Sequence, residues 1–245
     1  MPDVTPGNPD RRGLTGKHTM SDLTLIIGNK NYSSWSMRPW VLLTQLGIPF
    51  KEMLFKFGSP EWDQNIARYS PSRQVPVLWR NVNGSEEAVW DSLAIMETLH
   101  EMFPDKNVWP RDASARAMAR CASAEMHSGF RDLRGKMPMN IRASHPGKGM
   151  TPEVEANITR VETLWSECRE RYSSGGDFLF GPFSAADAMY APVVMRFNTY
   201  APPLGAVSRR YCDAMRAAPG IRAWIEDALK ESEFFAEDEP YAQAP

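Results

Sequence analysis

The chain has 245 residues, of which 42% are hydrophobic and 24% are charged, and its formal net charge is −2. A balance this close to neutral argues against a nucleic-acid-binding protein, which normally presents a basic face. The length is enough for one large domain or two small ones.

The cysteines of the chain are few and far apart. Cys121, Cys168 and Cys212 form no CxxC pair, so they predict neither a disulfide framework nor a zinc site. The sequence also shows no apolar stretch long enough to span a membrane and no signal-peptide core. We therefore expect a cytoplasmic protein that binds no metal, no nucleic acid and no membrane.

The first hundred residues predict a small α/β domain. Residues 1–19 are polar and lack periodicity, which indicates a disordered leader. After them we expect elements in the order βαβαββα, over residues 23–27, 36–46, 50–57, 60–67, 75–79, 88–90 and 92–103. A helical crossover should make the first two strands parallel, and the Asn83-Gly84 turn should make the last two antiparallel.

Strand signals end at about residue 103. Apolar residues at helical spacing then predict helices over residues 113–134, from 152, from 184, over 208–217 and over 221–230. Ser184 is followed three residues later by Asp187, which is close to a capping box. The predicted order is leader, α/β domain, linker, all-helical domain and tail, at residues 1–19, 20–103, 104–112, 113–235 and 236–245.

A hydroxyl-rich turn, NYSSWS at residues 31–36, precedes the first expected helix. Backbone N–H groups and the helix dipole attract anions at such a place. A hydroxyl that donates to a sulfur there favours the thiolate, which is the nucleophilic form of a thiol. We interpret the turn as a site for an anionic sulfur, with Ser33 or Ser34 as donor. The plainer alternative is that these serines only cap the helix.

Four short motifs occur in the order found in the cytosolic glutathione transferases. Residues 33–38 (SSWSMR) resemble the SSCxWR signature of the zeta class, the relatives of maleylacetoacetate isomerase, and Trp35 stands where that signature has its cysteine. The other motifs resemble the family's cis-proline segment, the acid-serine pair of its third helix and its helical-domain capping motif, at residues 74–76, 90–95 and 183–187. The resemblance implies a thioredoxin-like N-terminal domain followed by an all-α C-terminal domain.

The resemblance also implies glutathione as co-substrate and roles for the first motif. Ser33 would stabilise the glutathione thiolate, and Ser34 would contact the same sulfur or peptide. Tyr32 is a competing donor, because other transferase classes use a tyrosine. Trp35 and Arg38 complete this part of the glutathione site, and a structural ion pair is the alternative role of Arg38.

The second and third motifs supply the rest of the expected glutathione site. A cis bond between Val75 and Pro76, next to Gln74, would leave the Val75 backbone free to pair with an extended peptide. Asp91 and Ser92 would bind the ammonium and carboxylate of the γ-glutamyl end at a helix start. An ordinary trans-proline and a simple helix cap are the interpretations without the family context.

The second substrate should lie against the first helix of the helical domain. We expect Met126, Phe130 and Arg134 on that wall, and a mostly apolar wall suits a small hydrophobic electrophile. The predicted function is a glutathione S-transferase whose thiolate attacks that electrophile. Family members are commonly dimers, so we expect a homodimer.

Two other functions stay open. Glutathione-dependent cis-trans isomerisation of maleylacetoacetate needs cations for a dicarboxylate, for which Arg134 and Arg196 are candidates, but Trp35 departs from the isomerase signature. A non-catalytic member of the fold that binds a hydrophobic ligand or a partner protein is the other possibility. Glutathione binding is favoured by the presence of Ser33, Pro76 and Ser92, one from each of the first three motifs.

Overall fold

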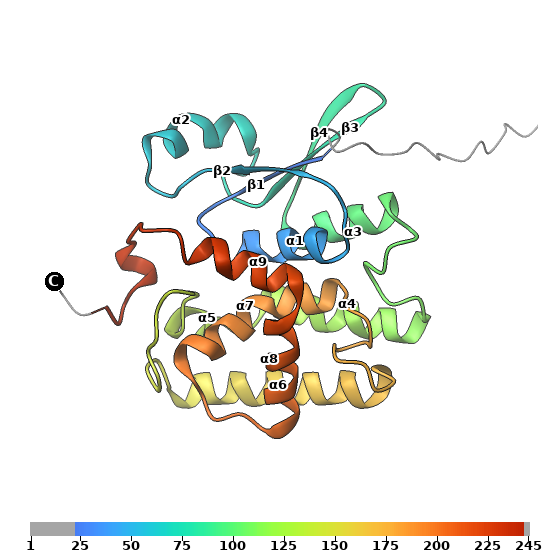
Figure 1. Cartoon of the computed structure of the whole chain (residues 1–245), viewed down its shortest axis with the longest axis vertical. Coiled ribbons are helices and arrows are strands. Elements are labelled where there is room, and N and C mark those ends of the chain that lie inside the picture. Colours follow the sequence, from blue (N-terminus) through green and yellow to red (C-terminus); the bar gives the residue numbers. More distant parts are fainter. Residues whose placement is uncertain (1–22, 243–245) are drawn as a thin grey trace, which may run out of the picture.

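The computed structural model describes residues 23–242, so the expected leader lies outside the described residues. Figure 1 shows a small sheet with its helices, stacked on a larger helical part. Within residues 23–242, no helix combines the length and the hydropathy that are needed to cross a membrane.

The first part has the predicted βαβαββα order. Its elements are β1 (Leu23–Ile27), α1 (Ser34–Gln45), β2 (Lys51–Leu54), α2 (Pro60–Tyr69), β3 (Val77–Val82), β4 (Ser85–Trp90) and α3 (Ser92–Met102). The strand order is β2-β1-β3-β4. Strand β1 is parallel to β2, and β3 is antiparallel to β4, which confirms the two predicted pairs. Strand β1 is also antiparallel to β3.

Helix α1 begins two residues before its predicted start, with Ser33 as the N-cap. Pro39 consequently lies in the second turn of the helix rather than the first. Proline has no N–H group, so the Trp35 carbonyl, four residues earlier, lacks the usual hydrogen bond within the helix. Because α1 starts earlier than predicted, Ser33 and Ser34 lie at its N-terminus.

The second part contains α4 (Ala113–Ser128), α5 (Arg131–Lys136), α6 (Pro152–Tyr172), α7 (Ala185–Tyr200), α8 (Ala206–Ala217), α9 (Pro219–Ala228) and a 3-10 turn (Ala236–Asp238). The prediction of one continuous helix over residues 113–134 is wrong, because the helix is interrupted between α4 and α5. Phe130 there has φ = 54°, a left-handed conformation that interrupts the helix. At Gly129, a Cβ would lie 2.7 Å from the Glu125 carbonyl oxygen.

The two faces of the sheet are covered differently. Helix α2 lies on one face, and α1 and α3 lie between the sheet and the helical part (Figure 1). Under α2, Ile26, Phe55 and Val77 form a small buried cluster. On the other face, one large core runs from β1 through α1 to α7 and α9. Helix α1 is therefore held from the sheet side and from the helical side.

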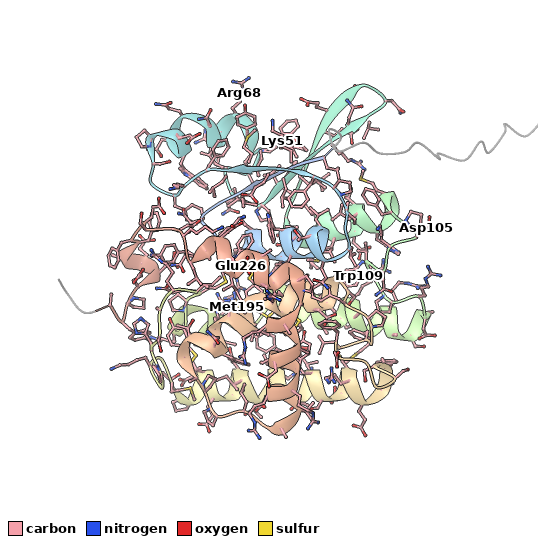
Figure 2. The ribbon with its side chains drawn as sticks, viewed as in Figure 1. Lys51, Arg68, Asp105, Trp109, Met195 and Glu226 are labelled. Carbon is pink, nitrogen blue, oxygen red and sulfur yellow. The ribbon has the colours of Figure 1, made fainter. Side chains whose placement is uncertain are left out.

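The predicted linker at residues 104–112 packs into the helical part. The Val108 carbonyl accepts the Ala185 N–H over 2.8 Å. Trp109 and Met195 are buried, whereas Arg68 and Asp105 are exposed (Figure 2). Part of this segment therefore belongs to the helical core.

A buried lysine joins the two parts. Lys30 Nζ lies 2.8 Å from a Glu52 carboxylate oxygen and 2.7 Å from one of Asp227. It also lies 4.5 Å from the ring centre of Trp40 and 5.5 Å from that of Trp224. Because Asp227 and Trp224 belong to α9, these contacts fix α9 against the turn that precedes α1.

Candidate active site

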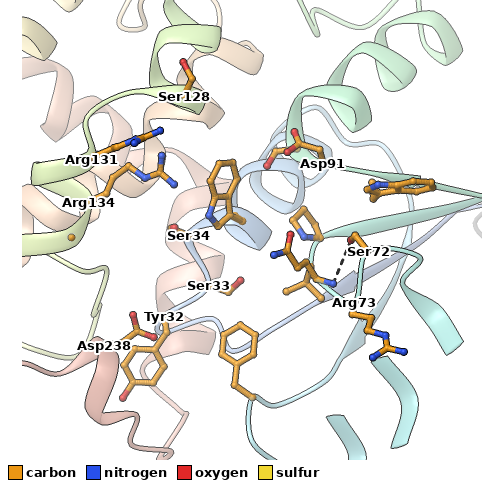
Figure 3. Close-up of a pocket in the computed structure, with 18 of the residues that line it drawn as sticks. Tyr32, Ser33, Ser34, Ser72, Arg73, Asp91, Ser128, Arg131, Arg134 and Asp238 are labelled. Carbon is orange, nitrogen blue, oxygen red and sulfur yellow. Dashed lines mark hydrogen bonds between the residues drawn. The ribbon is translucent and has the colours of Figure 1, made fainter. Parts of the chain in front are cut away.

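A cavity of about 850 Å³ lies where the two parts meet (Figure 3). Its walls come from the turn before α1, the loop before β3, the start of α3, the α4–α5 region, α7 and the segment after α9. This volume falls in the range of small-molecule sites. The cavity brings the first three sequence motifs together.

Ser33 lies on the cavity wall at the N-terminus of α1. Its hydroxyl donates to Ser36 Oγ over 2.7 Å, and its Oγ accepts the Ser36 N–H over 3.4 Å. Ser34, the first residue of the helix, lines the cavity beside it. The positive end of the helix dipole makes this position favourable for an anion.

Tyr32 lines the same cavity, but its hydroxyl is engaged elsewhere. It lies within hydrogen-bond distance of the Glu239 carboxylate and of the Glu233 carbonyl, and it accepts a hydrogen bond from Arg142 Nη2 over 2.8 Å. Figure 3 shows the Tyr32 ring pointing away from Ser33. The phenol is therefore not directed toward a sulfur at the helix start.

The peptide bond between Val75 and Pro76 is cis. Strand β3 begins only at Val77, and the Val75 backbone groups make no hydrogen bond within residues 23–242. The preceding residue, Gln74, is exposed, and its N–H donates to Ser70 Oγ over 3.1 Å. The open Val75 backbone is thus available to pair with an extended peptide, as at a sheet edge.

Helix α3 starts at Ser92 and is capped by Asp91, whose carboxylate accepts the Leu93 N–H over 2.9 Å. Asp91 has φ = 72°, an uncommon conformation for a residue with a side chain. Ser92 is fully buried, and its Oγ has no hydrogen-bond partner in the described part of the chain. A buried, unpaired hydroxyl is costly, and here it stands beside a cavity at a helix start, where anions bind.

The wall that the helical part contributes is cationic rather than mostly apolar. Arg131 and Arg134 reach the cavity from α5, and Arg196 reaches it from α7. Arg131 and Arg134 lie on the same side of the cavity (Figure 3). Burial lowers the pKa of Arg134, and it lowers the pKa of Arg196 to about 10. Both side chains remain positively charged at neutral pH.

Two residues of the predicted substrate wall do not line this cavity. Met126 is fully buried in the large core, and Phe130 packs into the same core at the break between α4 and α5. Arg134 does line the cavity. The predicted wall is corrected in this way because Met126 lies on the buried face of α4, and the break after α4 turns Phe130 into the core.

Arg38 lies behind the cavity wall rather than on it. Its guanidinium carbon is 4.1 Å from the ring centre of Trp35, a cavity residue that Arg134 also approaches at 4.8 Å. Burial lowers the pKa of Arg38 to about 9, and its Nε and Nη1 have no hydrogen-bond partner among the described residues. The structure thus shows Arg38 supporting Trp35 and not forming an ion pair within those residues.

Asp238 and Arg131 are cavity residues that the sequence interpretation did not identify. Arg131 precedes Arg134 by three residues, and this helical spacing was an available signal. Asp238 lies in the expected tail, where no local pattern marks it. Among residues 23–242, no group of three or more His, Cys, Asp or Glu residues is placed to hold a metal ion.

Comparison with known proteins decides the family. The family models "Glutathione S-transferase, N-terminal domain" and "Glutathione S-transferase, C-terminal domain" match residues 32–102 and 151–227, which together exceed half of the chain. The chain belongs to the glutathione S-transferase family. This membership confirms the resemblance of the four motifs and indicates an enzyme of the glutathione transferase class.

Curated relatives of this transferase include a probable maleylacetoacetate isomerase of Caenorhabditis elegans, 26% identical over 72% of this chain and 82% of the relative. They also include the glutathione S-transferase Z2 of Arabidopsis thaliana, 24% identical over 74% of this chain and 84% of the relative. The transferase is therefore a zeta-like member. A glutathione transferase homologue from Burkholderia, crystallised with bound glutathione, has the same fold, with a TM-score of 0.63, 22% identity and coverage of 85% and 99% of the two chains.

Proposed function

We propose that this transferase binds glutathione along the wall from Ser33 to Ser92 and that Ser33 stabilises the thiolate. One spatial observation carries the proposal. The helix-start serine adjoins the same cavity as the Val75 backbone and the Ser92 hydroxyl, which have no hydrogen-bond partner among residues 23–242. These groups match the sulfur, the cysteinyl backbone and the γ-glutamyl carboxylate of one extended tripeptide. Asp91 would meet the ammonium group, while Ser34 would contact the sulfur or the peptide.

The proposed chemistry follows from the properties of the thiol. A free thiol has a pKa of about 8.5 and is mostly protonated at neutral pH. A hydroxyl donor and a helix dipole favour the thiolate, so the thiol proton passes to solvent at a lower pH. The thiolate then attacks an electrophilic carbon of the second substrate and forms a carbon–sulfur bond. With an activated alkene, the π bond breaks and its other carbon takes a proton from solvent. With a chlorodinitrobenzene, the carbon–chlorine bond breaks and chloride leaves.

For the second substrate, we propose a small electrophile with an apolar or aromatic body and an anionic group. Trp35 offers a ring, and the arginines of α5 and α7 offer cations that pair with carboxylates. This proposal replaces the purely hydrophobic electrophile, because such a substrate would leave the arginines of the cavity wall without anionic partners.

Isomerisation of maleylacetoacetate is the second candidate. The arginine wall suits a dicarboxylate, and a relative carries the isomerase name. The thiolate would add to the double bond, the carbon–carbon bond would rotate, and glutathione would leave unchanged. Trp35 in place of the signature cysteine ranks this candidate second.

We further propose a cytoplasmic homodimer that serves detoxification. The small α/β part would gain buried surface from pairing, since a domain of this size has a limited core of its own. Sedimentation velocity on the purified protein tests the dimer, and fractionation of cells that produce it tests the location.

The decisive experiment measures glutathione binding by calorimetry and then turnover. The acceptors are ethacrynic acid, its neutral methyl ester, a chlorodinitrobenzene and maleylacetoacetate. We expect conjugation, with kcat/KM lowered about 100-fold in Ser33→Ala and unchanged in Ser123→Ala, which alters a buried serine away from the cavity.

Two results would change this proposal. Absence of glutathione binding would favour the non-catalytic alternative. Turnover of maleylacetoacetate alone, with no conjugate formed from the other acceptors, would favour the isomerase.

A further inference from the structure

Ser36 is a buried serine of α1 that makes two contacts with Ser33. It is fully buried and does not line the cavity. Its Oγ accepts the Ser33 hydroxyl over 2.7 Å and the Gly28 N–H over 3.1 Å. Its backbone N–H donates to Ser33 Oγ over 3.4 Å. Ser36 thus links the end of β1 to the hydroxyl at the helix start.

Only one hydrogen atom can lie between the two serine oxygens. In the structure Ser33 donates it to Ser36, and in that direction the Ser33 proton is not available for a sulfur in the cavity. If Ser36 donates to Ser33, the Ser33 proton is free to point into the cavity. A thiolate is an acceptor, so its presence favours the second direction.

We propose that Ser36 is a positioning residue that directs the Ser33 hydroxyl toward the glutathione thiolate. The donors form a chain from the Gly28 N–H through Ser36 and Ser33 to the sulfur. Hydrogen bonds in such a chain polarise one another, so each donor strengthens the next. This inference rests on the proposed function and adds a residue that does not touch the ligand.

Backbone contacts fix the position of Ser33 independently of Ser36. The Ser33 N–H donates to the Asn29 carbonyl over 2.8 Å, and the Ser33 carbonyl accepts the Met37 N–H over 3.0 Å. Loss of the Ser36 hydroxyl would therefore change the direction of the Ser33 proton more than the position of its oxygen. This separation makes the role of Ser36 measurable.

The test measures the pKa of the thiol of bound glutathione from the ultraviolet absorbance of the thiolate. Wild type is compared with Ser33→Ala, Ser36→Ala and the double variant. We expect Ser36→Ala to raise the thiol pKa by roughly 0.5 to 1 unit, which means about three- to tenfold less thiolate below that pKa. The KM for glutathione should change less than about twofold, because Ser36 does not contact the ligand.

The double variant separates positioning from a merely structural role. If Ser36 acts through Ser33, the double variant has the same thiol pKa as Ser33→Ala. A further rise in the Ser33→Ala background would overturn the proposal. So would an unchanged thiol pKa in Ser36→Ala when Ser33→Ala raises it. If Ser33→Ala also leaves the thiol pKa unchanged, the proposed function fails instead.

Two additional variants guard the comparison. Ser123→Ala removes another buried hydroxyl, outside the cavity, and should leave the thiol pKa unchanged. Ser36→Cys keeps nearly the same side-chain volume but has a weaker donor, so it replaces Ser36→Ala in the measurement if that variant does not fold. It should also raise the thiol pKa, and an unchanged value in a folded Ser36→Cys protein would count against the chain of donors.

Discussion

The hydroxyl of Tyr32 accepts a hydrogen bond from Arg142 Nη2 over 2.8 Å, and the carboxylate of Glu239 lies on its other side. Burial, together with Glu239, raises the pKa of Tyr32 to about 12. The phenol therefore stays protonated at neutral pH and holds the segment after α9 in place. This arrangement separates the roles of two adjacent residues, because Ser33 faces the cavity at the helix start.

Tyr32→Phe should consequently preserve most of the activity. We expect kcat to fall less than about threefold, while the free energy of unfolding falls by about 1 to 3 kcal/mol because buried partners lose a hydrogen bond. Steady-state kinetics and urea unfolding measure the two effects. A loss of activity as large as that of Ser33→Ala would show that the tyrosine, not the serine, serves the thiol.

Ser92→Ala should weaken glutathione binding. Hydrogen bonds to charged groups contribute roughly 1.5 to 3 kcal/mol, so the dissociation constant should rise about 10- to 100-fold. Calorimetry with glutathione measures this change. Cysteinylglycine, which lacks the γ-glutamyl group, is the control ligand and should bind wild type and variant equally. If Ser92→Ala weakened the binding of both ligands equally, Ser92 would not bind the γ-glutamyl carboxylate.

Arg134→Met should discriminate between acceptors. We expect kcat/KM for ethacrynic acid to fall about tenfold, since a charge-assisted hydrogen bond is lost, and kcat/KM for its methyl ester to change little. Arg120→Met is the matched control, because Arg120 is an exposed arginine of α4 that pairs with Glu97 outside the cavity. Equal losses for acid and ester would argue against an anionic acceptor.

Asp238→Asn should have the opposite effect on an anionic acceptor. Burial raises the pKa of Asp238, while Arg196 lowers it. The carboxylate opposes a second anion in the cavity, so we expect its removal to raise kcat/KM for ethacrynic acid by about three- to tenfold. Lowering the pH protonates the Asp238 carboxylate of the wild type, which should contribute the same rise in kcat/KM for ethacrynic acid. The variant has no carboxylate at this position, so its pH profile should lack this contribution.

The stability of the fold should depend on pH through Asp187. This buried carboxylate accepts N–H groups of Leu179 and Ser184 and the hydroxyl of Tyr211. Burial raises its pKa from 3.8 to about 6, although the hydrogen bonds act in the other direction. The folded state thus binds the proton more tightly than the unfolded state. The stabilising contribution is complete below pH of about 4 and is lost as the pH rises through about 6.

The expected loss across this window is about 3 kcal/mol of unfolding free energy. Urea unfolding at several pH values, for wild type and Asp187→Asn, measures it as a difference between the two proteins. The variant should be less stable at every pH, because an amide cannot accept all of these donors, yet its stability should not fall in this window. Parallel pH profiles would contradict the assignment.

Local sequence patterns predicted the helices and strands well where residues close in the chain determine the structure. The directions of the first and last strand pairs follow from the lengths of their connections, and Ser184 with Asp187 forms the capping box. The break at Phe130 was missed because a left-handed phenylalanine is stabilised by packing of distant elements. Asp238 was missed for the same reason, since its place in the cavity depends on contacts between segments 200 residues apart, such as Tyr32 with Glu233.

The segment after α9 has a consequence for the order in which the site is assembled. Phe235 packs against Tyr32 and Phe57, and Asp238 forms part of the cavity wall. Because synthesis proceeds from the N-terminus, this segment leaves the ribosome after every other element of the cavity wall. The cavity wall is therefore complete only when the residues after α9 have joined the first part of the fold.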